Sequence, residues 1–247
     1  MTSHLVLISG GSSGIGLALA RTAPGPAARV LSLSRRAAPG SEHVAVDLAA
    51  PAGWVAAAGV FEHEVRGFAG ERVTFVHCAG TLTPIGFAGE VDPAAYQRNV
   101  VLNSAAPQVL GDAFLRCARD TRARCDLVFI SSGAAHSVYP GWTSYCAGKA
   151  ATDQWARVAG AEQAERGGRC RVISVAPGVV ATAMQAEIRA TAARDFPDRG
   201  RFVALHRDGA LRPPDDAARD IWHLLAGDFD NGAVLDLRTP SVPSSLT

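Results

Sequence analysis

The chain has 247 residues, of which 48% are hydrophobic, and its formal net charge at pH 7 is +1. This length and composition suit a single α/β domain over residues 1–247, and the absence of a basic block excludes the usual nucleic-acid-binding patterns. No apolar stretch is long enough to span a membrane, and the N-terminal apolar run reaches glycines too soon for a signal peptide. The five cysteines show neither metal-ligand nor disulfide spacing, so we expect a cytoplasmic protein with reduced thiols and no metal site.

The first pattern in the chain is a strand, a glycine-rich turn and a helix. Residues 4–9 form a short apolar run typical of a buried parallel strand, and residues 10–16 contain four glycines. Glycines let the backbone approach a pyrophosphate, and the free N–H groups of a helix N-terminus favour an anion. This order predicts a dinucleotide site, although a glycine-rich turn alone is also found in ordinary tight loops.

The second predicted strand, residues 29–34, ends at two arginines. In a dinucleotide fold this end faces the adenosine ribose, where an acidic residue would repel a 2′-phosphate. Ser34, Arg35 and Arg36 instead supply a hydroxyl and two guanidinium groups, which suit a phosphate. The pattern favours NADP(H) as the cofactor, while two solvated loop arginines remain the alternative interpretation.

The middle of the chain continues the alternation of strands and helices. Residues 43–47 predict a third strand, residues 51–70 a helix and residues 73–78 a fourth strand. A helix should then run to about Arg119 and carry Asn103 within an apolar pattern, where asparagine is unfavourable. Asn103 is therefore either a functional residue, a satisfied polar core residue or the site of a local kink.

A tyrosine and a lysine lie one helical turn apart after the fifth predicted strand, residues 126–131. Tyr145 and Lys149 would share a face of a helix that runs to about Arg166, and Lys149 is the only lysine in the chain. An ammonium group can reach a sugar hydroxyl and lower the pKa of a neighbouring phenol. A surface lysine beside a core tyrosine would show the same spacing.

The last third of the chain completes the pattern. Residues 171–176 predict a sixth strand, and residues 182–211 are polar and weakly patterned, as in a lid or specificity loop. A helix should begin near Pro213, and residues 233–237 predict a seventh strand before a loose tail from Thr239. The alternation predicts a single Rossmann-type, doubly wound, seven-stranded parallel sheet with helices on both faces.

Together these residues resemble the short-chain dehydrogenase/reductase family along essentially the whole chain. The motifs stand in the family's order: Gly10-x-x-x-Gly14-Ile15-Gly16, Asp47, Ala79-Gly80, Asn103, Ser132, Tyr145-x-x-x-Lys149 and Pro177-Gly178. Several stretches are similar to the branch that contains sepiapterin reductases and bacterial benzil reductases: residues 79–86, 131–135, 141–146, 177–185 and 231–236. The chain departs from the family at His77-Cys78, where two asparagines are usual; His77 can replace one of their hydrogen bonds, and Cys78 replaces the other poorly.

The resemblance implies a catalytic set of Asn103, Ser132, Tyr145 and Lys149. Tyr145 would donate a proton to a substrate carbonyl oxygen as the nicotinamide delivers hydride to the carbon. Lys149 would lower the pKa of the phenol and hold the ribose hydroxyls, and Ser132 would orient and polarise the carbonyl. Asn103 would hold a water that links Lys149 to solvent.

The resemblance also implies an NADP(H) site across the carboxyl ends of the strands. Arg35, with Ser34 and Arg36, would bind the 2′-phosphate, and Thr182 would bind the carboxamide. The full expected set of cofactor-binding residues is Gly10, Ser12, Ser13, Gly14, Ile15, Gly16, Ser34, Arg35, Arg36, Asp47, Leu48, Ala79, Gly80, Tyr145, Lys149, Pro177, Gly178, Val180 and Thr182.

The expected substrate contacts are Ser132, Trp142, Tyr145, Met184, Gln185 and Asp236. Trp142 can equally be a packed aromatic beside a helix start. Asp236 matches the position at which sepiapterin reductases anchor the pterin, and a purely structural role remains open. His136 is interpreted as a surface loop residue.

The leading hypothesis is an NADPH-dependent carbonyl reductase, an oxidoreductase that converts one carbonyl of a 1,2-dicarbonyl to an α-hydroxy ketone. Its substrate would be a small carbonyl compound such as a benzil-like diketone or a pterin side chain. The alternatives are an oxidoreductase of a secondary-metabolite pathway and a non-catalytic NADP(H)-sensing regulator, against which the intact Ser132, Tyr145 and Lys149 argue. Family resemblance further implies a homodimer or homotetramer.

Overall fold

The computed structural model describes residues 3–25 and 27–239. Its centre is a seven-stranded sheet in the order β3-β2-β1-β4-β5-β6-β7, and every pairing is parallel. The strands are β1 (His4–Ser9), β2 (Ala28–Ser34), β3 (Glu42–Ala45), β4 (Arg72–His77), β5 (Arg124–Ile130), β6 (Cys170–Ala176) and β7 (Ala233–Asp236). The reversal of strand order beside β1 gives the doubly wound topology that the sequence predicts.

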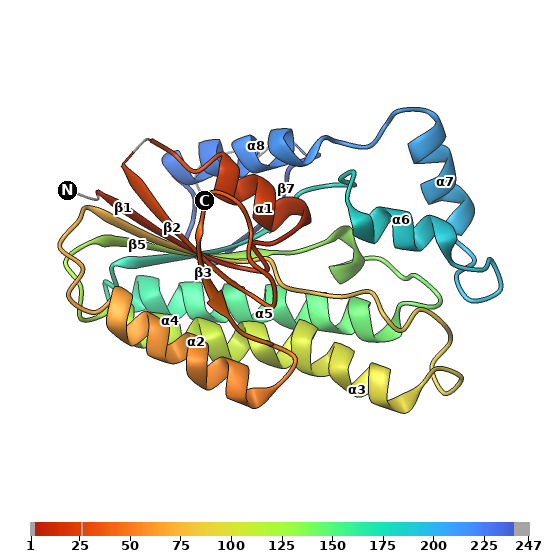
Figure 1. Ribbon diagram of the computed structural model, residues 1–247, viewed down its shortest axis with the longest axis horizontal. Helices are drawn as coiled ribbons and strands as arrows, with labels where there is room; N and C mark the ends of the chain where they lie inside the picture. The colour runs from red at the N-terminus through yellow and green to blue at the C-terminus, as the bar shows by residue number, and fades with distance from the viewer. Residues whose placement is uncertain (1–2, 26, 240–247) are drawn as a thin grey trace.

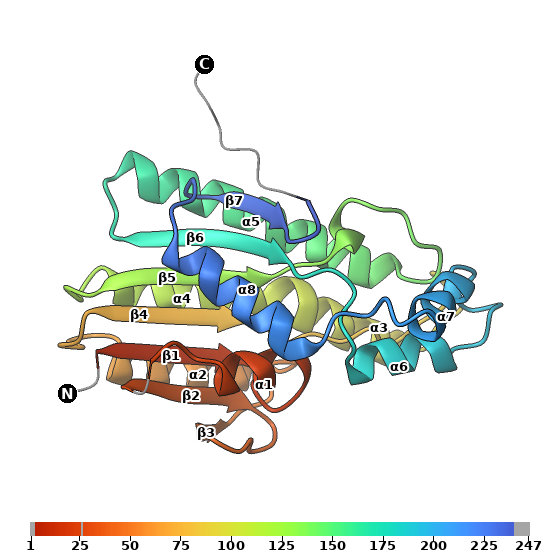
Figure 2. The same cartoon turned by 90° about the horizontal axis from the view of Figure 1, so that it is seen from above.

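Helices cover both faces of the sheet (Figure 1). Helices α1 (Gly14–Arg21) and α8 (Pro214–Ala226) lie on one face, while α2 (Pro51–Glu64), α4 (Ala106–Ala118) and α5 (Thr143–Glu165) lie on the other. Helix α3 (Pro93–Val100) precedes α4. Figure 2 shows α6 (Ala183–Ala190) and α7 (Arg199–Arg207) beyond the carboxyl ends of the strands. Ligands of such sheets bind at these strand ends.

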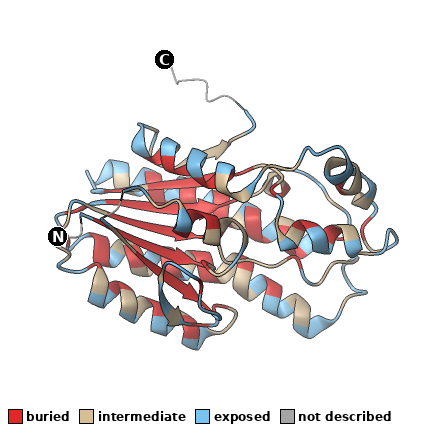
Figure 3. Ribbon diagram, turned by 45° about the horizontal axis from the view of Figure 1, so that its top comes forward, coloured by how far each residue is buried: buried red, intermediate tan, exposed pale blue. Residues whose placement is uncertain are grey.

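The apolar strands serve two cores at once. Along β1, Leu5 and Leu7 pack into the core shared with α2, α4 and α5, while Val6 and Ile8 pack into the core shared with α1 and α8. Because alternate side chains point to opposite faces, a strand covered on both sides must be apolar throughout. Figure 3 shows this buried layer running through the middle of the molecule.

The long helix expected to end near Arg119 contains an irregular turn. Residues Val101–Ala105 form a π-helical turn between α3 and α4, with Asn103 buried inside it. Such a turn inserts an extra residue into the helical ladder and is found frequently at functional sites. Of the alternatives considered from sequence, a local irregularity of the helix is therefore present at Asn103.

Three expectations about element boundaries are corrected by the structure. Helix α2 ends at Glu64 rather than at residue 70, and β3 ends at Ala45, so that Asp47 lies in the following turn. Residues 182–211 were expected to form a loop, yet they contain both α6 and α7. Phe196 and Phe202 are buried there and anchor the segment to a third apolar cluster near Tyr145. Most of the expected tail, residues 240–247, lies outside the described residues.

Candidate active site

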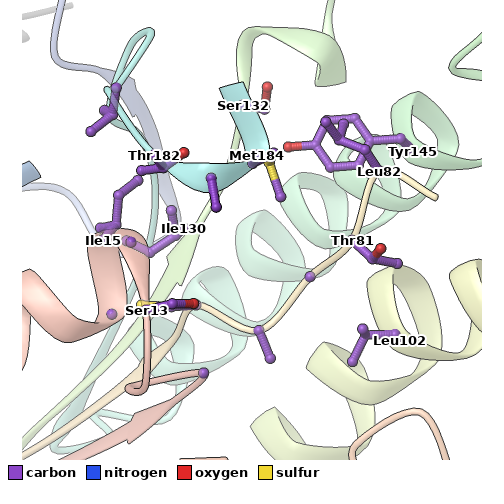
Figure 4. A pocket seen from close by; sticks show the side chains of 18 of the residues that line it. Ser13, Ile15, Thr81, Leu82, Leu102, Ile130, Ser132, Tyr145, Thr182 and Met184 are labelled. Carbon is purple, nitrogen blue, oxygen red and sulfur yellow. The ribbon is translucent and has the colours of Figure 1, made fainter. Parts of the chain in front are cut away.

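A cavity of about 450 Å³ opens along the carboxyl ends of β1, β2, β4, β5 and β6. It extends from the glycine turn before α1 to α6 and α7, and Figure 4 shows side chains from these separate segments converging on it. Ligand sites of doubly wound sheets lie at this edge, outside the strand ends. The cavity is therefore the candidate active site.

The glycine turn brings backbone to backbone at one end of the cavity. A Cβ on Gly16 would lie 2.4 Å from the Gly10 carbonyl oxygen, and one on Gly10, whose φ is 71°, would lie 2.9 Å from Ala79. Ser13 precedes α1 and makes no side-chain capping bond to it. The first N–H groups of the helix therefore remain available to an anion such as a pyrophosphate.

The end of β2 carries positive charge. Arg35 and Arg36 line the cavity, are exposed and form no ion pair with any residue in the described part of the chain. The Ser34 hydroxyl donates to the Arg36 carbonyl oxygen at 2.7 Å and so fixes the turn that presents both arginines. Sequence reasoning missed Arg98 on α3, which also lines this end of the cavity. Its Nη2 lies 3.8 Å from Asp47 Oδ2. Its place depends on the packing of α3 against the turn after β3, which no local pattern reveals.

Tyr145 and Lys149 are buried on the cavity side of α5, with 6% and 7% of their surface exposed. The Lys149 ammonium donates to the Ile130 carbonyl oxygen at 2.7 Å and lies 5.8 Å from the centre of the Tyr145 ring. Ser132 follows β5, and in Figure 4 its hydroxyl lies on the same side of the cavity as the Tyr145 hydroxyl. The three side chains predicted as a catalytic group are therefore brought together, and the surface-lysine alternative is wrong.

Burial controls the ionisation of this group. It raises the pKa of the Tyr145 phenol to about 12, and a hydrogen bond from Ser132 partly opposes the rise. It lowers the pKa of Lys149 to about 8, against the favourable charge of Asp153. At neutral pH both groups hold their protons, so Tyr145 is a proton donor.

Asn103 is satisfied entirely by protein groups and does not line the cavity. Its amide nitrogen donates at 2.8 Å to the Thr81 carbonyl oxygen and at 2.8 Å to Asn99 Oδ1, while its Oδ1 accepts from the Thr81 N–H at 3.0 Å. It ties the π-helical turn to the segment after β4. Its expected role in holding a water stays a prediction.

His77 forms a hydrogen bond across the sheet, while the expectation that it replaces one bond of the usual asparagine pair stays a prediction. Its Nδ1 lies 3.0 Å from Ser9 Oγ, which accepts from the N–H groups of Cys78 at 3.1 Å and Ala79 at 3.2 Å. Because the hydroxyl accepts twice, its own hydrogen is directed to Nδ1, which places the ring proton on Nε2. Burial lowers the pKa of His77 to about 3, so the ring is neutral. The bond joins β4 to β1 beneath the glycine turn.

The end of the cavity beside α6 and α7 is aromatic. Trp142 stacks on Phe196 with ring centres 4.3 Å apart and lies edge-on to Tyr145 at 5.6 Å. Tyr139 and Phe202 complete this aromatic cluster with Trp142 and Phe196. Trp142 is thus both packed and cavity-lining, which unites the two interpretations made from sequence.

Other predicted substrate residues differ in their placement. Met184 lines the cavity, and Gln185 lines it while donating to the Phe202 carbonyl oxygen at 3.1 Å. Asp236 does not line the cavity, because its carboxylate binds Arg238. His136 is exposed as expected, yet its Nε2 lies 3.1 Å from the buried carboxylate of Asp153. Sequence reasoning missed Arg201 and Arg238, which both line the cavity and come from segments without a recognisable motif.

Most of the expected cofactor and substrate residues line this one cavity, although their contacts with ligands stay predictions. They are Gly10, Ser12, Ser13, Gly14, Ile15, Gly16, Ser34, Arg35, Arg36, Asp47, Leu48, Ala79, Gly80, Ser132, Trp142, Tyr145, Lys149, Pro177, Gly178, Val180, Thr182, Met184 and Gln185.

Comparison with known proteins identifies the family. The family model described as short chain dehydrogenase matches residues 4–193. This chain belongs to the short-chain dehydrogenase family. The chain is 37% identical over 166 residues to a benzil reductase ((S)-benzoin forming) of Bacillus subtilis, covering 67% of the chain and 68% of the relative. It is 34% identical over 170 residues to the sepiapterin reductase of Mus musculus, covering 67% and 63% respectively.

The fold of this short-chain dehydrogenase also matches solved structures. A short chain dehydrogenase/reductase from Saccharomyces cerevisiae superposes with a TM-score of 0.82 at 23% identity, covering 96% of this chain and 97% of that one. Enzymes of the family use NAD(P)(H), and the glycine turn, the arginines after β2 and the Tyr145–Lys149 pair fit such a dinucleotide along the cavity. No group of three metal-ligating side chains and no helix able to span a membrane occurs within residues 3–25 and 27–239.

Proposed function

We propose that this chain is an NADPH-dependent carbonyl reductase that converts one carbonyl of an aromatic 1,2-dicarbonyl to an α-hydroxy ketone. The observation that carries the proposal is the buried Tyr145 phenol at the junction of the glycine-lined and aromatic parts of one cavity. The similarity to a benzil reductase supports the dicarbonyl class, and the Tyr139, Trp142 and Phe202 side chains that line the cavity suit an aryl ketone.

The preference for the phosphorylated cofactor is supported by charge at the end of β2. Arg35 and Arg36 follow Ser34 where an acidic residue would select NAD(H), and neither is neutralised by a carboxylate in the described part of the chain. A guanidinium fork binds a phosphate with paired charge-assisted hydrogen bonds. The two arginines would hold the 2′-phosphate.

Tyr145, Ser132 and Lys149 would each have a separate role in the reduction. The dihydronicotinamide supplies hydride when bound. Tyr145 Oη gives its proton to the carbonyl oxygen of the substrate, which becomes a hydroxyl, and Tyr145 is left as a phenolate. The Ser132 hydroxyl orients the carbonyl beside the phenol before this transfer. Lys149, charged and 5.8 Å from the tyrosine ring centre, stabilises the phenolate until a proton is recovered from solvent.

Burial prepares Tyr145 for this role. Its pKa of about 12 keeps the phenol protonated at neutral pH, so that the proton is present when a substrate enters. The same burial shields the Lys149 ammonium from water and strengthens its attraction for the phenolate as it forms. The aromatic cluster excludes water from the reacting carbonyl.

Cofactor oxidation with benzil, sepiapterin and methylglyoxal tests the proposal directly. We expect NADPH, and much less NADH, to be consumed with benzil, and benzoin to be the product. If none of the three substrates is reduced while NADPH still binds by fluorescence, the dinucleotide site stands and the carbonyl reductase function is wrong.

A further inference from the structure

Two arginines at the substrate end of the cavity have no role in the chemistry described so far. Arg201 lies on α7 and donates from Nη1 to the Tyr139 hydroxyl at 3.1 Å. Arg238 follows β7, and both arginines line the cavity together with Tyr139 and Trp142. Segments far apart in the chain thus deliver two guanidinium groups to the rim of the aromatic cluster.

Arg238 passes close to the catalytic serine. A Cβ added to Gly178 would lie 3.2 Å from Arg238 Cγ, and one added to Gly133 would lie 3.0 Å from Arg238 Nη2. The side chain therefore runs from the turn after β6 to the turn that follows Ser132. It passes over Gly178 and Gly133, where a larger residue would stand in its way. This places its guanidinium beside the group that would receive the substrate carbonyl.

Asp236 binds the Arg238 guanidinium group but does not use all of its N–H donors. Arg238 Nε donates to Asp236 Oδ1 at 2.9 Å, and Nη2 binds Oδ2 of the same carboxylate. Arginine has five N–H donors, and Nη1 makes no hydrogen bond to any residue within 3–25 and 27–239. The side chain of Arg238 is 46% exposed, so these remaining donors face solvent at the cavity.

The charged side chains that line this end of the cavity are positive. Arg201 forms no ion pair in the described part of the chain, and Asp236 is the carboxylate that Arg238 contacts. Outside the lining, Glu187 accepts from the uncharged Thr83 hydroxyl at 2.7 Å and keeps its charge, while Asp195 lies 3.6 Å from Arg194. The cavity lining at this end contains no acidic residue. The two guanidinium groups therefore line an apolar, aromatic part of the cavity in which no carboxylate competes with a ligand for them.

We propose that Arg201 and Arg238 form an anion-binding rim that selects carbonyl substrates bearing a carboxylate, with an aromatic or other flat apolar body. The inference rests on the proposed carbonyl reductase function and names the substrate class of that same cavity. A carboxylate matches the fork of a guanidinium, and the aromatic cluster takes the body of the molecule. Tyr139, a member of the aromatic cluster, joins the cluster to the rim through its hydrogen bond with Arg201.

A matched pair of substrates tests this rim. Phenylglyoxylate and its methyl ester share one aryl ketone and differ in the negative charge. We expect Arg201→Gln and Arg238→Gln each to raise the ratio of the KM for the acid to that for the ester by about tenfold, since each removes a charged partner of the carboxylate. Arg207→Gln on α7 is the control and leaves the ratio unchanged, because Arg207 pairs with Asp208 and does not line the cavity.

Two further measurements distinguish carboxylate binding by the rim from a structural effect of the substitutions. The preference for the acid should weaken as salt rises, because both arginines are solvent-accessible. The affinity for NADPH should be the same in Arg238→Gln as in the parent protein. A ratio that changes less than twofold in both glutamine variants, or KM values that rise equally for acid and ester, would overturn the proposal.

Direct binding distinguishes this inference from the proposed function. Calorimetric titration of phenylglyoxylate into the NADP⁺ complex measures the affinity of the rim for a carboxylate without turnover. Binding that weakens about tenfold in the glutamine variants supports the rim even if no dicarbonyl is reduced. Equal binding in the parent and variant proteins refutes the rim even if benzil is reduced rapidly.

Discussion

Replacing Lys149 by methionine is expected to stabilise the protein while it abolishes catalysis. Methionine keeps a long unbranched side chain and removes a charge from a site that is 7% exposed. Burial lowers the pKa of Lys149 from its usual 10.5 to about 8, so the folded protein binds this proton more weakly than the unfolded chain does. The ammonium therefore destabilises the folded state at neutral pH.

The size of this destabilisation follows from the pKa shift of Lys149. A difference of about 2.5 pKa units corresponds to about 3.4 kcal/mol of folding free energy at about 1.36 kcal/mol per unit. The variant also loses the 2.7 Å hydrogen bond to the Ile130 carbonyl oxygen, and an unsatisfied buried acceptor costs about 1–2 kcal/mol. We expect Lys149→Met to raise the free energy of unfolding at pH 7 by about 2 kcal/mol.

The same reasoning gives a pH dependence with a definite sign. The destabilisation by the charge is fully present below pH 8, fades as the folded protein loses the proton above its pKa of about 8, and vanishes above the usual value of 10.5. Linkage predicts that the advantage of the variant falls by about 2 kcal/mol between about pH 7 and about pH 9.5. Other groups that titrate in this range are common to both proteins, so the difference isolates Lys149.

Urea unfolding of the cofactor-free proteins, followed by circular dichroism, measures this difference. Arg207→Met is the control, because Arg207 lies on the surface with its side chain 73% exposed, and it should change the free energy of unfolding by less than about 0.5 kcal/mol. A Lys149→Met protein that is less stable than its parent at pH 7, by an amount independent of pH, would refute the reasoning.

Two other variants test the cofactor end of the cavity. Arg35→Asp should lower the preference for NADPH over NADH by at least about tenfold in kcat/KM, because it replaces an attractive charge by a repulsive one; an unchanged ratio removes Arg35 from the phosphate site. Gly16→Ala should weaken NADPH binding by at least about tenfold in a fluorescence titration, since its Cβ would lie 2.4 Å from the Gly10 carbonyl oxygen and force the turn apart. Unaltered affinity would show that the turn is not a pyrophosphate cradle, and Gly200→Ala, at an open position on α7, is the matched control.

The sequence predicted the sheet because its central strands face two cores. Leu5, Val6, Leu7 and Ile8 alternate between them, so the strand appears as an uninterrupted apolar run that local patterns detect well. The positions of Ser132, Tyr145 and Lys149 followed from the same logic, since they lie at a strand end or one helical turn apart. These features depend on short-range order in the chain.

The features missed from sequence depend on tertiary packing. Helices α6 and α7 are short, and they are held by Ile188, Phe202 and the intervening Phe196 in the third apolar cluster. The guanidinium groups of Arg201 and Arg238 reach the cavity because α7 begins and β7 ends beside it. Asp236 could be placed near the substrate from sequence, whereas its bond to Arg238 could not, and its contact with substrate stays a prediction.

The most direct test of the account is the rate of NADPH oxidation with benzil in the parent protein and in Tyr145→Phe. The variant removes one oxygen from a buried ring that keeps its packing against Trp142, so its fold and its affinity for NADPH should be retained. The account predicts rapid reduction by the parent and a loss of at least about a thousandfold in kcat for the variant, since the proton donor is gone. Reduction of benzil by Tyr145→Phe at the parental rate would contradict it.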